Sequence, residues 1–221
     1  MNSIDDDWPD QMWSAAEQVN GGNGAAWLLP LAALAVTGCR PAALEKGVQF
    51  AVVTVDGKRC IEATIQGVKL TENRGQKEHK FRWFTNSQTH RKNELVALTK
   101  AVMSAPGRKL VVTYDAEAIS TRLREISTRL WPRRKNKVTA YCYRELLSST
   151  AKAAGADAVE LALAMGHRST ESQGAYARAG RTRSGTGKPW GSVSGKTAVR
   201  TDRGPMARFK AASKLKKRRA P

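Results

Sequence analysis

The feature that most constrains the fold is an apolar segment near the N-terminus, residues 25–36, with the sequence AAWLLPLAALAV. Its apolar side chains cover most faces of a helix, and such a helix has to be surrounded by other elements of the chain. The segment is too short to cross a bilayer, and it contains Pro30. It therefore predicts a buried central helix, and a chain of 221 residues with 41% hydrophobic residues can build a core around it.

Three later segments show the near alternation of apolar and polar residues that is typical of β-strands. They read GVQFAVVTV, CIEATIQGV and HKFRWFT, and they are rich in β-branched and aromatic residues. The polar sequence DGKR separates the first two, and a longer turn containing TENRGQ separates the last two. These segments predict a three-stranded antiparallel sheet.

After Arg91 the apolar residues recur with helical spacing. The expected helices cover residues 93–104, 116–130, 141–154, 156–165 and 170–179, and a shorter helix is expected at 11–18. The fold class is therefore α+β, mainly α, with helices around a small three-stranded antiparallel sheet. We expect an acidic lead-in at 1–23, one domain at 24–180 and a basic flexible tail at 181–221.

The net charge of +19 is concentrated in that tail, which holds 13 Lys or Arg and one acidic residue, Asp202. Its first part is rich in Gly, Ser and Thr, which predicts a mobile linker, and its end, MARFKAASKLKKRRAP, could form a basic helix on a partner. Such a potential attracts polyanions, and nucleic acid, either DNA or RNA, is the expected partner. An anionic membrane surface and a solubilising or ribosomal-type arm are the alternatives. The candidate DNA contacts are Lys214, Lys216, Lys217, Arg218 and Arg219, with Arg133 and Arg134 in the basic loop WPRRKNK.

Other features argue against export, a metal centre and nucleotide binding. The N-terminus MNSIDDDWPDQ is acidic, unlike a signal peptide, and three widely spaced cysteines suit a reducing compartment, so we expect a cytoplasmic protein without a membrane partner. The three histidines and the acidic residues show no metal-ligand spacing, so neither a metal nor another cofactor is expected. The segment WGSVSGKT has Trp190 where a phosphate-binding loop needs its first glycine.

Five polar residues stand at positions where this architecture could bring them together. Arg40 follows the central helix in a Gly-Cys-Arg-Pro turn, Lys69 ends the second strand, and Arg144 lies one turn into a helix whose other face is apolar. His167 follows Gly166 at a helix end, nine residues before Tyr176. Each has an ordinary structural interpretation as a surface, capping or core residue, and it is their order along the chain that indicates a site.

That order, on a framework of helix, sheet and helices, resembles the catalytic domain of the tyrosine recombinases, the phage-type integrases. LAVTGCRPAALEKGV resembles the first arginine box of that family, and GVK before the hairpin turn resembles the position of its lysine. TAYCYRELLSSTAKAAG is similar to the second box, with Tyr141-x-x-Arg144 in place of His-x-x-Arg. AMGHRSTESQGAYARAG resembles the Leu-Gly-His box followed by the nucleophilic tyrosine, with Met165 in the leucine position.

The resemblance implies the catalytic residues Arg40, Lys69, Tyr141, Arg144, His167 and Tyr176. It also implies a protein of phage, plasmid or bacterial origin whose partner is double-stranded DNA, on which it could act as a homo-oligomer. Planar guanidiniums suit the equatorial oxygens of a phosphodiester, on which negative charge rises as a nucleophile adds. In this scheme the Tyr176 phenol attacks phosphorus, Lys69 protonates the leaving 5′ oxygen, and His167 donates a hydrogen bond to the phosphate.

The sequence departs from the family pattern at several positions. Tyr141 stands where a histidine assists the nucleophile, and a phenol with a reference pKa near 10 is a poor base. Ala43 and Glu145 replace a glutamate and a histidine of the two arginine boxes, and too few residues precede the match for the usual core-binding domain. Two hypotheses follow: a DNA-rejoining recombinase, or a regulator or accessory factor that binds DNA on the same fold without catalysis.

Overall fold

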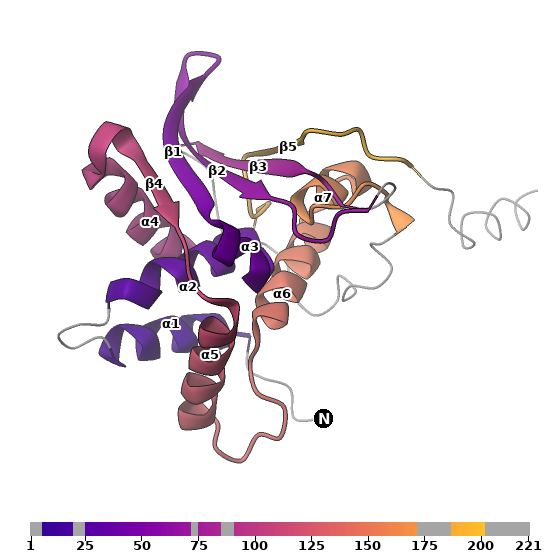
Figure 1. Cartoon of the computed structure of the whole chain (residues 1–221). Coiled ribbons are helices and arrows are strands. Elements are labelled where there is room, and N and C mark those ends of the chain that lie inside the picture. Colours follow the sequence, from indigo (N-terminus) through magenta and orange to yellow (C-terminus); the bar gives the residue numbers. More distant parts are fainter. Residues whose placement is uncertain (1–5, 20–24, 72–74, 85–90, 172–186, 202–221) are drawn as a thin grey trace, which may run out of the picture.

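The expected buried helix is present at the centre of the molecule as α2, Ala25–Thr37. The computed structural model describes residues 6–19, 25–71, 75–84, 91–171 and 187–201. The segment 31–36 of α2 is fully buried, as its apolar composition requires. Figure 1 shows α2 with the sheet above it and helices on its other sides.

Seven α-helices and five strands are present in the described residues, so the mainly helical α+β class is confirmed. The other helices are α1 (Trp8–Val19), α3 (Pro41–Lys46), α4 (Lys92–Ser104), α5 (Ala116–Leu130), α6 (Ala140–Ala153) and α7 (Ala158–Ala164). The strands are β1 (Val48–Val55), β2 (Lys58–Gln66), β3 (Glu78–Phe84), β4 (Lys109–Val112) and β5 (Ser192–Gly195).

Local sequence signals explain where these helices begin. Asp115 caps α5, because its carboxylate accepts a hydrogen bond from the backbone N–H of Ala118 at 2.6 Å. Asp157 caps α7 in the same way through the N–H groups of Val159 and Glu160. The bounds of α4 to α7 confirm the expected helices from 93 to 165, with small shifts of their ends. Most of the helix expected at 170–179 lies outside the described residues.

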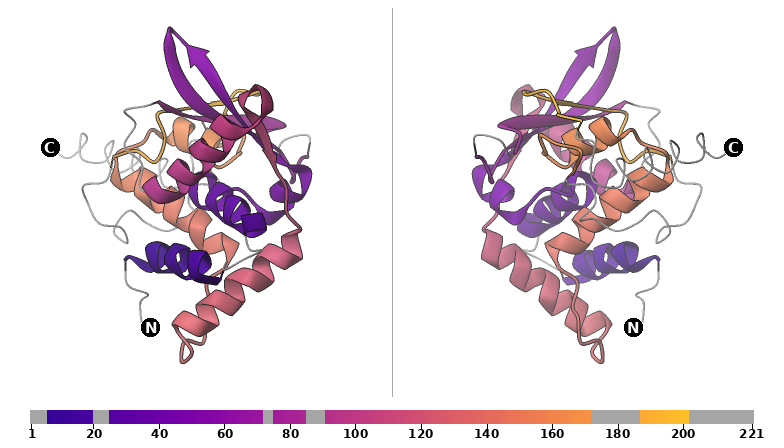
Figure 2. Two further views of the ribbon diagram at one scale, coloured as in Figure 1. Left: turned by 90° about the vertical axis from the view of Figure 1, so that its left-hand side faces the viewer. Right: turned by 90° about the vertical axis from the view of Figure 1, so that its right-hand side faces the viewer.

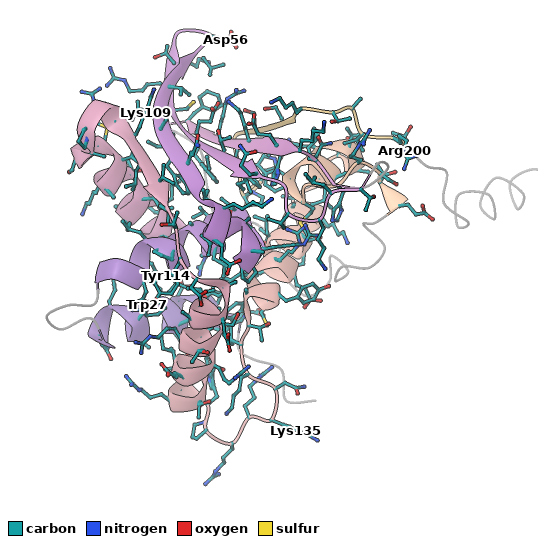
Figure 3. All side chains as sticks on the ribbon, viewed as in Figure 1. Trp27, Asp56, Lys109, Tyr114, Lys135 and Arg200 are labelled. Carbon is teal, nitrogen blue, oxygen red and sulfur yellow. The ribbon has the colours of Figure 1, made fainter. Side chains whose placement is uncertain are left out.

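The sheet has five strands in the order β4-β1-β2-β3-β5, all antiparallel, so the expectation of three strands is wrong. The three central strands are those the sequence predicts. The two edge strands are four residues long, and neither KLVV nor SVSG has enough alternating residues to predict a strand by itself. Figure 2 shows that the β1–β2 hairpin projects beyond the helices, and Asp56 marks its tip in Figure 3.

Residues 187–201, which lie within the range expected to form the tail, contain a strand that pairs with β3. Trp190 is 2% exposed and packs edge to face on Phe81, at a centroid distance of 5.8 Å. The indole N–H of Trp83 donates to the carbonyl of Pro189 at 2.9 Å. These contacts hold β5 on β3, and the segment that resembled a phosphate-binding loop forms this edge strand.

Within the range expected as the lead-in, α1 packs on the core of the molecule. Trp8 of α1 packs edge to face on Tyr143 of α6 with 4.8 Å between ring centroids. Arg91, which is 5% exposed, donates to Asp10 at 2.6 Å and to Glu94 at 3.2 Å. The apolar face of α1 therefore completes the core below α2 (Figure 1).

Candidate functional site

A pocket below the sheet brings together Arg40, Lys69 and Arg144, three of the residues that the sequence singles out. Its walls are the turn after α2, the loop between β2 and β3, the first turns of α6 and the turn after α7. In Figure 1 this is the region where α3, the end of β2 and α6 approach one another. The lining residues are Cys39, Arg40, Ala43, Ile65, Gln66, Gly67, Val68, Lys69, Leu70, Gly75, Gln76, His79, Arg144, Met165 and Gly166.

The turn between α2 and α3 places Arg40 at the pocket. Gly38 has φ +57°, and a Cβ there would lie 2.9 Å from the Cδ2 of Leu147, so only glycine lets this turn approach α6 so closely. Pro41 begins α3 and favours the extended backbone observed for Arg40, with φ −77° and ψ 148°. The Gly-Cys-Arg-Pro sequence thus fixes the backbone position from which the Arg40 side chain extends.

Arg144 joins three walls of the pocket from a buried position on α6, with 4% of its surface exposed. Its Nη1 donates to the carbonyl of Gly38 at 2.9 Å, and its Nη2 donates to the carbonyl of Met165. Nη2 also lies 3.4 Å from Nε2 of His167. Because the guanidinium holds the turns after α2 and α7, Arg144 has a structural role in addition to any contact with a ligand.

His167 lies beside Arg144 in the turn after α7. Gly166, with φ +65°, makes the turn, and the His167 N–H donates to the carbonyl of Ala162 at 2.7 Å. Burial lowers the pKa of His167 to about 3, and the charges of Arg144 and Arg40 lower it further in the same direction. An arginine can only donate, so Nε2 accepts and the neutral ring carries its proton on Nδ1.

Lys69 is exposed in the loop after β2, and its neighbours hold the base of that loop. Lys46 of α3 donates to the carbonyl of Gly67 at 2.8 Å. The Gln76 side chain donates to the carbonyls of His167 at 3.1 Å and Thr197 at 2.7 Å and accepts from the Thr197 N–H at 3.0 Å. The loop is therefore connected both to the His167 turn and to the segment after β5.

The other predicted site residues do not line the pocket in the described part of the chain. Tyr141 is 50% exposed on α6 and is absent from the lining. Arg133 and Arg134 lie in the α5–α6 loop, where Arg134 donates to the carbonyl of Asn136 at 2.6 Å. Lys135 marks this loop in Figure 3, at the opposite end of the molecule from Asp56. Tyr176, Lys214, Lys216, Lys217, Arg218 and Arg219 lie outside the described residues.

His79 is a pocket residue that sequence reasoning did not select. It lies on β3, is 7% exposed, and lines the pocket. Burial lowers its pKa to about 3, with further lowering by Arg144, Arg40 and His167. The signal was available in HKFRWFT, because alternation places His79 on the same face of the strand as Phe81 and Trp83, which point into the core.

The two neutral histidines make the fold sensitive to acid. Their ordinary pKa is 6.5 and their folded-state pKa is about 3, so between these values the unfolded chain binds more protons. Their contribution to stability is present above pH 6.5 and is lost as the pH falls towards 3.

At about pH 5 we expect each of the two histidines to lower the free energy of unfolding by about 1 to 2 kcal/mol relative to about pH 7.5. Urea unfolding of wild type, His79→Gln and His167→Gln at both pH values checks this. Equal losses in all three proteins would contradict it.

The metal-binding residue types and the pocket cysteine have the following surroundings in the described residues. No group of three or more His, Cys, Asp or Glu there could hold a metal ion. Cys39 lines the pocket, but burial raises the pKa of its thiol to about 11, so it is protonated at neutral pH and a poor nucleophile. In the same part of the chain, no helix is long and apolar enough to span a membrane.

Comparisons with known proteins add a structural likeness. No protein-family model matches the chain, and no curated protein matches it. Among solved structures it is similar to a XerA recombinase, with 14% sequence identity and a TM-score of 0.48 over 78% of this chain. The chain spans 58% of the length of that protein.

Proposed function

We propose that this protein breaks and rejoins DNA strands through a phosphotyrosyl intermediate, as a site-specific recombinase or integrase. The observation that carries the proposal is the convergence of Arg40, Lys69 and Arg144 on one pocket, with His167 beside Arg144. These residues are far apart in the sequence, and they are the cations and the imidazole that the family resemblance singles out. A phosphodiester is the ligand whose charge and shape fit them.

Each side chain has a distinct role in this proposal. The Arg40 and Arg144 guanidiniums bind the non-bridging oxygens, whose negative charge grows in the transition state. Arg144 is already oriented by the carbonyls of Gly38 and Met165, so its guanidinium is held in position before DNA binds. His167 lies beside Arg144 with a neutral ring, and a neutral imidazole can donate a hydrogen bond to a phosphate oxygen.

The covalent step transfers the phosphorus from one oxygen to another. The phenol oxygen of Tyr176 forms a bond to phosphorus as the bond from phosphorus to the 5′ oxygen breaks, and the phenol proton leaves to solvent or to a neighbouring base. The departing 5′ oxygen takes a proton from Lys69, whose exposed loop can approach DNA. The product is a 3′-phosphotyrosyl link that a 5′ hydroxyl can attack in the reverse reaction, so no nucleotide cofactor is consumed.

DNA binding in this proposal comes from cations around and beyond the pocket. Arg133 and Lys135 are exposed in the α5–α6 loop, and the end of the chain adds five cations in residues 214–219. Contacts of such residues with phosphates supply affinity without reading the base sequence. The net charge of +19 favours this polyanion over a neutral ligand.

A second candidate function is a DNA-binding regulator that does not cleave. The specific observation in its favour is the position of Tyr141, which stands in place of the family histidine and is 50% exposed outside the pocket lining. A site without a base for the nucleophile would bind the phosphate but react slowly. The two candidates differ in one measurable product, the covalent adduct.

A trapping experiment tests the proposal. Full-length protein is incubated with nicked duplexes carrying randomised sequence around the nick, so that the short cleaved fragment diffuses away, and adducts are separated on a denaturing gel. We expect a covalent adduct with wild type and none with Tyr176→Phe, because only the phenol oxygen can hold the phosphate. Tyr141→Phe is the matched control and should retain the adduct. Duplex binding without any adduct would favour the regulator.

A further inference from the structure

The His79 ring is an unusual constituent of the pocket wall. Only 7% of the residue is exposed, and its Nδ1 is buried without a hydrogen-bond partner in the described structure. Burying a polar nitrogen without a partner is unfavourable, and in most proteins such groups are paired. An apolar residue at this position of β3 would fill the space without that cost. The histidine therefore calls for a functional explanation.

The structure makes room for this ring. Gly166 has φ +65°, and a Cβ at that position would lie 3.0 Å from Cε1 and 3.3 Å from Nδ1 of His79. On its other side the ring packs edge to face on Phe81, at a centroid distance of 6.0 Å. Because Gly166 and Phe81 confine the ring, its orientation is fixed before any ligand binds.

The groups that act on the pKa of His79 are two arginines and one histidine. Arg144 on α6, Arg40 in the turn before α3 and His167 in the turn after α7 all act on it electrostatically. Among the described residues that line the pocket there are three cations and no carboxylate. A concentration of cations next to a buried imidazole, without an acidic side chain in the lining, is complementary to an anion.

The tautomer follows from the burial of Nδ1. A buried N–H without an acceptor is costlier than a nitrogen lone pair without a donor, so the neutral ring is better protonated on Nε2. This leaves Nε2–H as the hydrogen bond that His79 can offer to a ligand in the pocket that it lines.

We propose that His79 is a phosphate-binding residue of this site, donating its Nε2–H to an oxygen of the phosphate that Arg40 and Arg144 bind. The inference rests on the proposed function, because it takes a DNA phosphate as the ligand. In this proposal His79 of β3 supplies an imidazole hydrogen bond to the phosphate. Tyr141, which stands in place of the family histidine, lies outside the pocket lining.

The test uses inorganic phosphate as probe and the full-length protein with ¹⁵N-labelled histidine. The chain has three histidines, so the His79 ring signals are assigned by their disappearance in His79→Gln. At neutral pH, added phosphate should shift the Nε2 signal of His79 and raise its pKa. It should do so with the same concentration dependence as the shift of His167. A His79 signal that stays unchanged while that of His167 moves overturns the proposal.

Three variants separate a direct hydrogen bond from a general charge effect. His79→Phe keeps an aromatic ring without a donor, and it should weaken phosphate binding about tenfold, as expected for removal of a hydrogen bond to a charged group. His79→Gln places an amide N–H near the Nε2 position and should restore most of the affinity. Lys80→Gln is the matched control, because Lys80 points to the opposite face of β3 and pairs with Glu62 at 2.8 Å. It should change phosphate affinity less than His79→Phe.

Failure of this inference can be distinguished from failure of the proposed function. Adduct formation on nicked DNA with no response of His79 to phosphate overturns the inference alone. A phosphate response of His79 without adduct formation supports the inference as anion binding, while the recombinase proposal fails. If His79→Phe does not fold, the titration of wild type still decides.

Discussion

Replacing Arg144 with alanine is expected to lower the free energy of unfolding by about 2 to 5 kcal/mol and to abolish the covalent adduct. The decrease in stability follows because the carbonyls of Gly38 and Met165 would be deprived of the guanidinium that bonds them in the buried turn region. The absence of the adduct follows because the guanidinium also faces the pocket. Urea unfolding and the trapping assay measure the two effects separately.

Two further variants distinguish the structural from the chemical role of Arg144. Arg144→Lys keeps a positive charge but cannot reproduce two guanidinium hydrogen bonds with fixed geometry, so it should form little of the adduct. Arg124→Ala removes an exposed arginine from α5 and should change the free energy of unfolding by no more than about 0.5 kcal/mol. If Arg144→Ala unfolded at the same urea concentration as Arg124→Ala, the structural role assigned to Arg144 would be wrong.

The parts of the fold that depend on regular patterns could be predicted from the sequence. The segment 25–36 is apolar on most faces, and residues 31–36 within it are fully buried. The three central strands carry the alternation that a half-buried strand needs. β5 could not be predicted in this way, because the position of SVSG depends on contacts made by residues just before it. Trp190 packs on Phe81, and the Trp83 indole N–H donates a hydrogen bond to the Pro189 carbonyl.

The candidate site, like the fold, could be predicted only in part from the sequence. Arg40 and Arg144 were predicted to meet from their order in the chain, and Gly38 explains how, since its missing Cβ lets the turn after α2 contact α6. The alternation in HKFRWFT predicts that His79 lies on the buried face of its strand, but nothing in the sequence shows that this position lines the pocket. The family resemblance singles out Tyr141, three residues before Arg144, yet on α6 it is exposed and absent from the lining. Spacing along a helix gives the turn on which a side chain lies, whereas packing decides where it points.

Removal of residues 202–221 is expected to weaken DNA binding and make it less sensitive to salt, with little change in stability. The removed segment contains eight Lys or Arg and Asp202, and it lies beyond the last residue that the structure describes. Each phosphate that the shortened chain no longer neutralises reduces the slope of log affinity against log salt by about 0.9, so a reduction of up to about 7 is expected if all eight cations touch DNA. Binding isotherms at several salt concentrations measure the slope. An unchanged slope would show that the tail does not contact DNA.

A shorter chain ending at Gly180 separates the charge of the tail from its packing. This truncation also removes β5 and Trp190, exposing Phe81 and Trp83, so it should destabilise the domain by at least about 3 kcal/mol. A full-length variant with Ser at positions 214, 216, 217, 218 and 219 removes charge alone and should reproduce most of the slope change without unfolding. If it bound DNA like wild type while the chain ending at Thr201 did not, the tail would act by a means other than its terminal basic cluster. Weaker DNA binding by the chain ending at Gly180 therefore reports on the fold, and the chain ending at Thr201 reports on electrostatics.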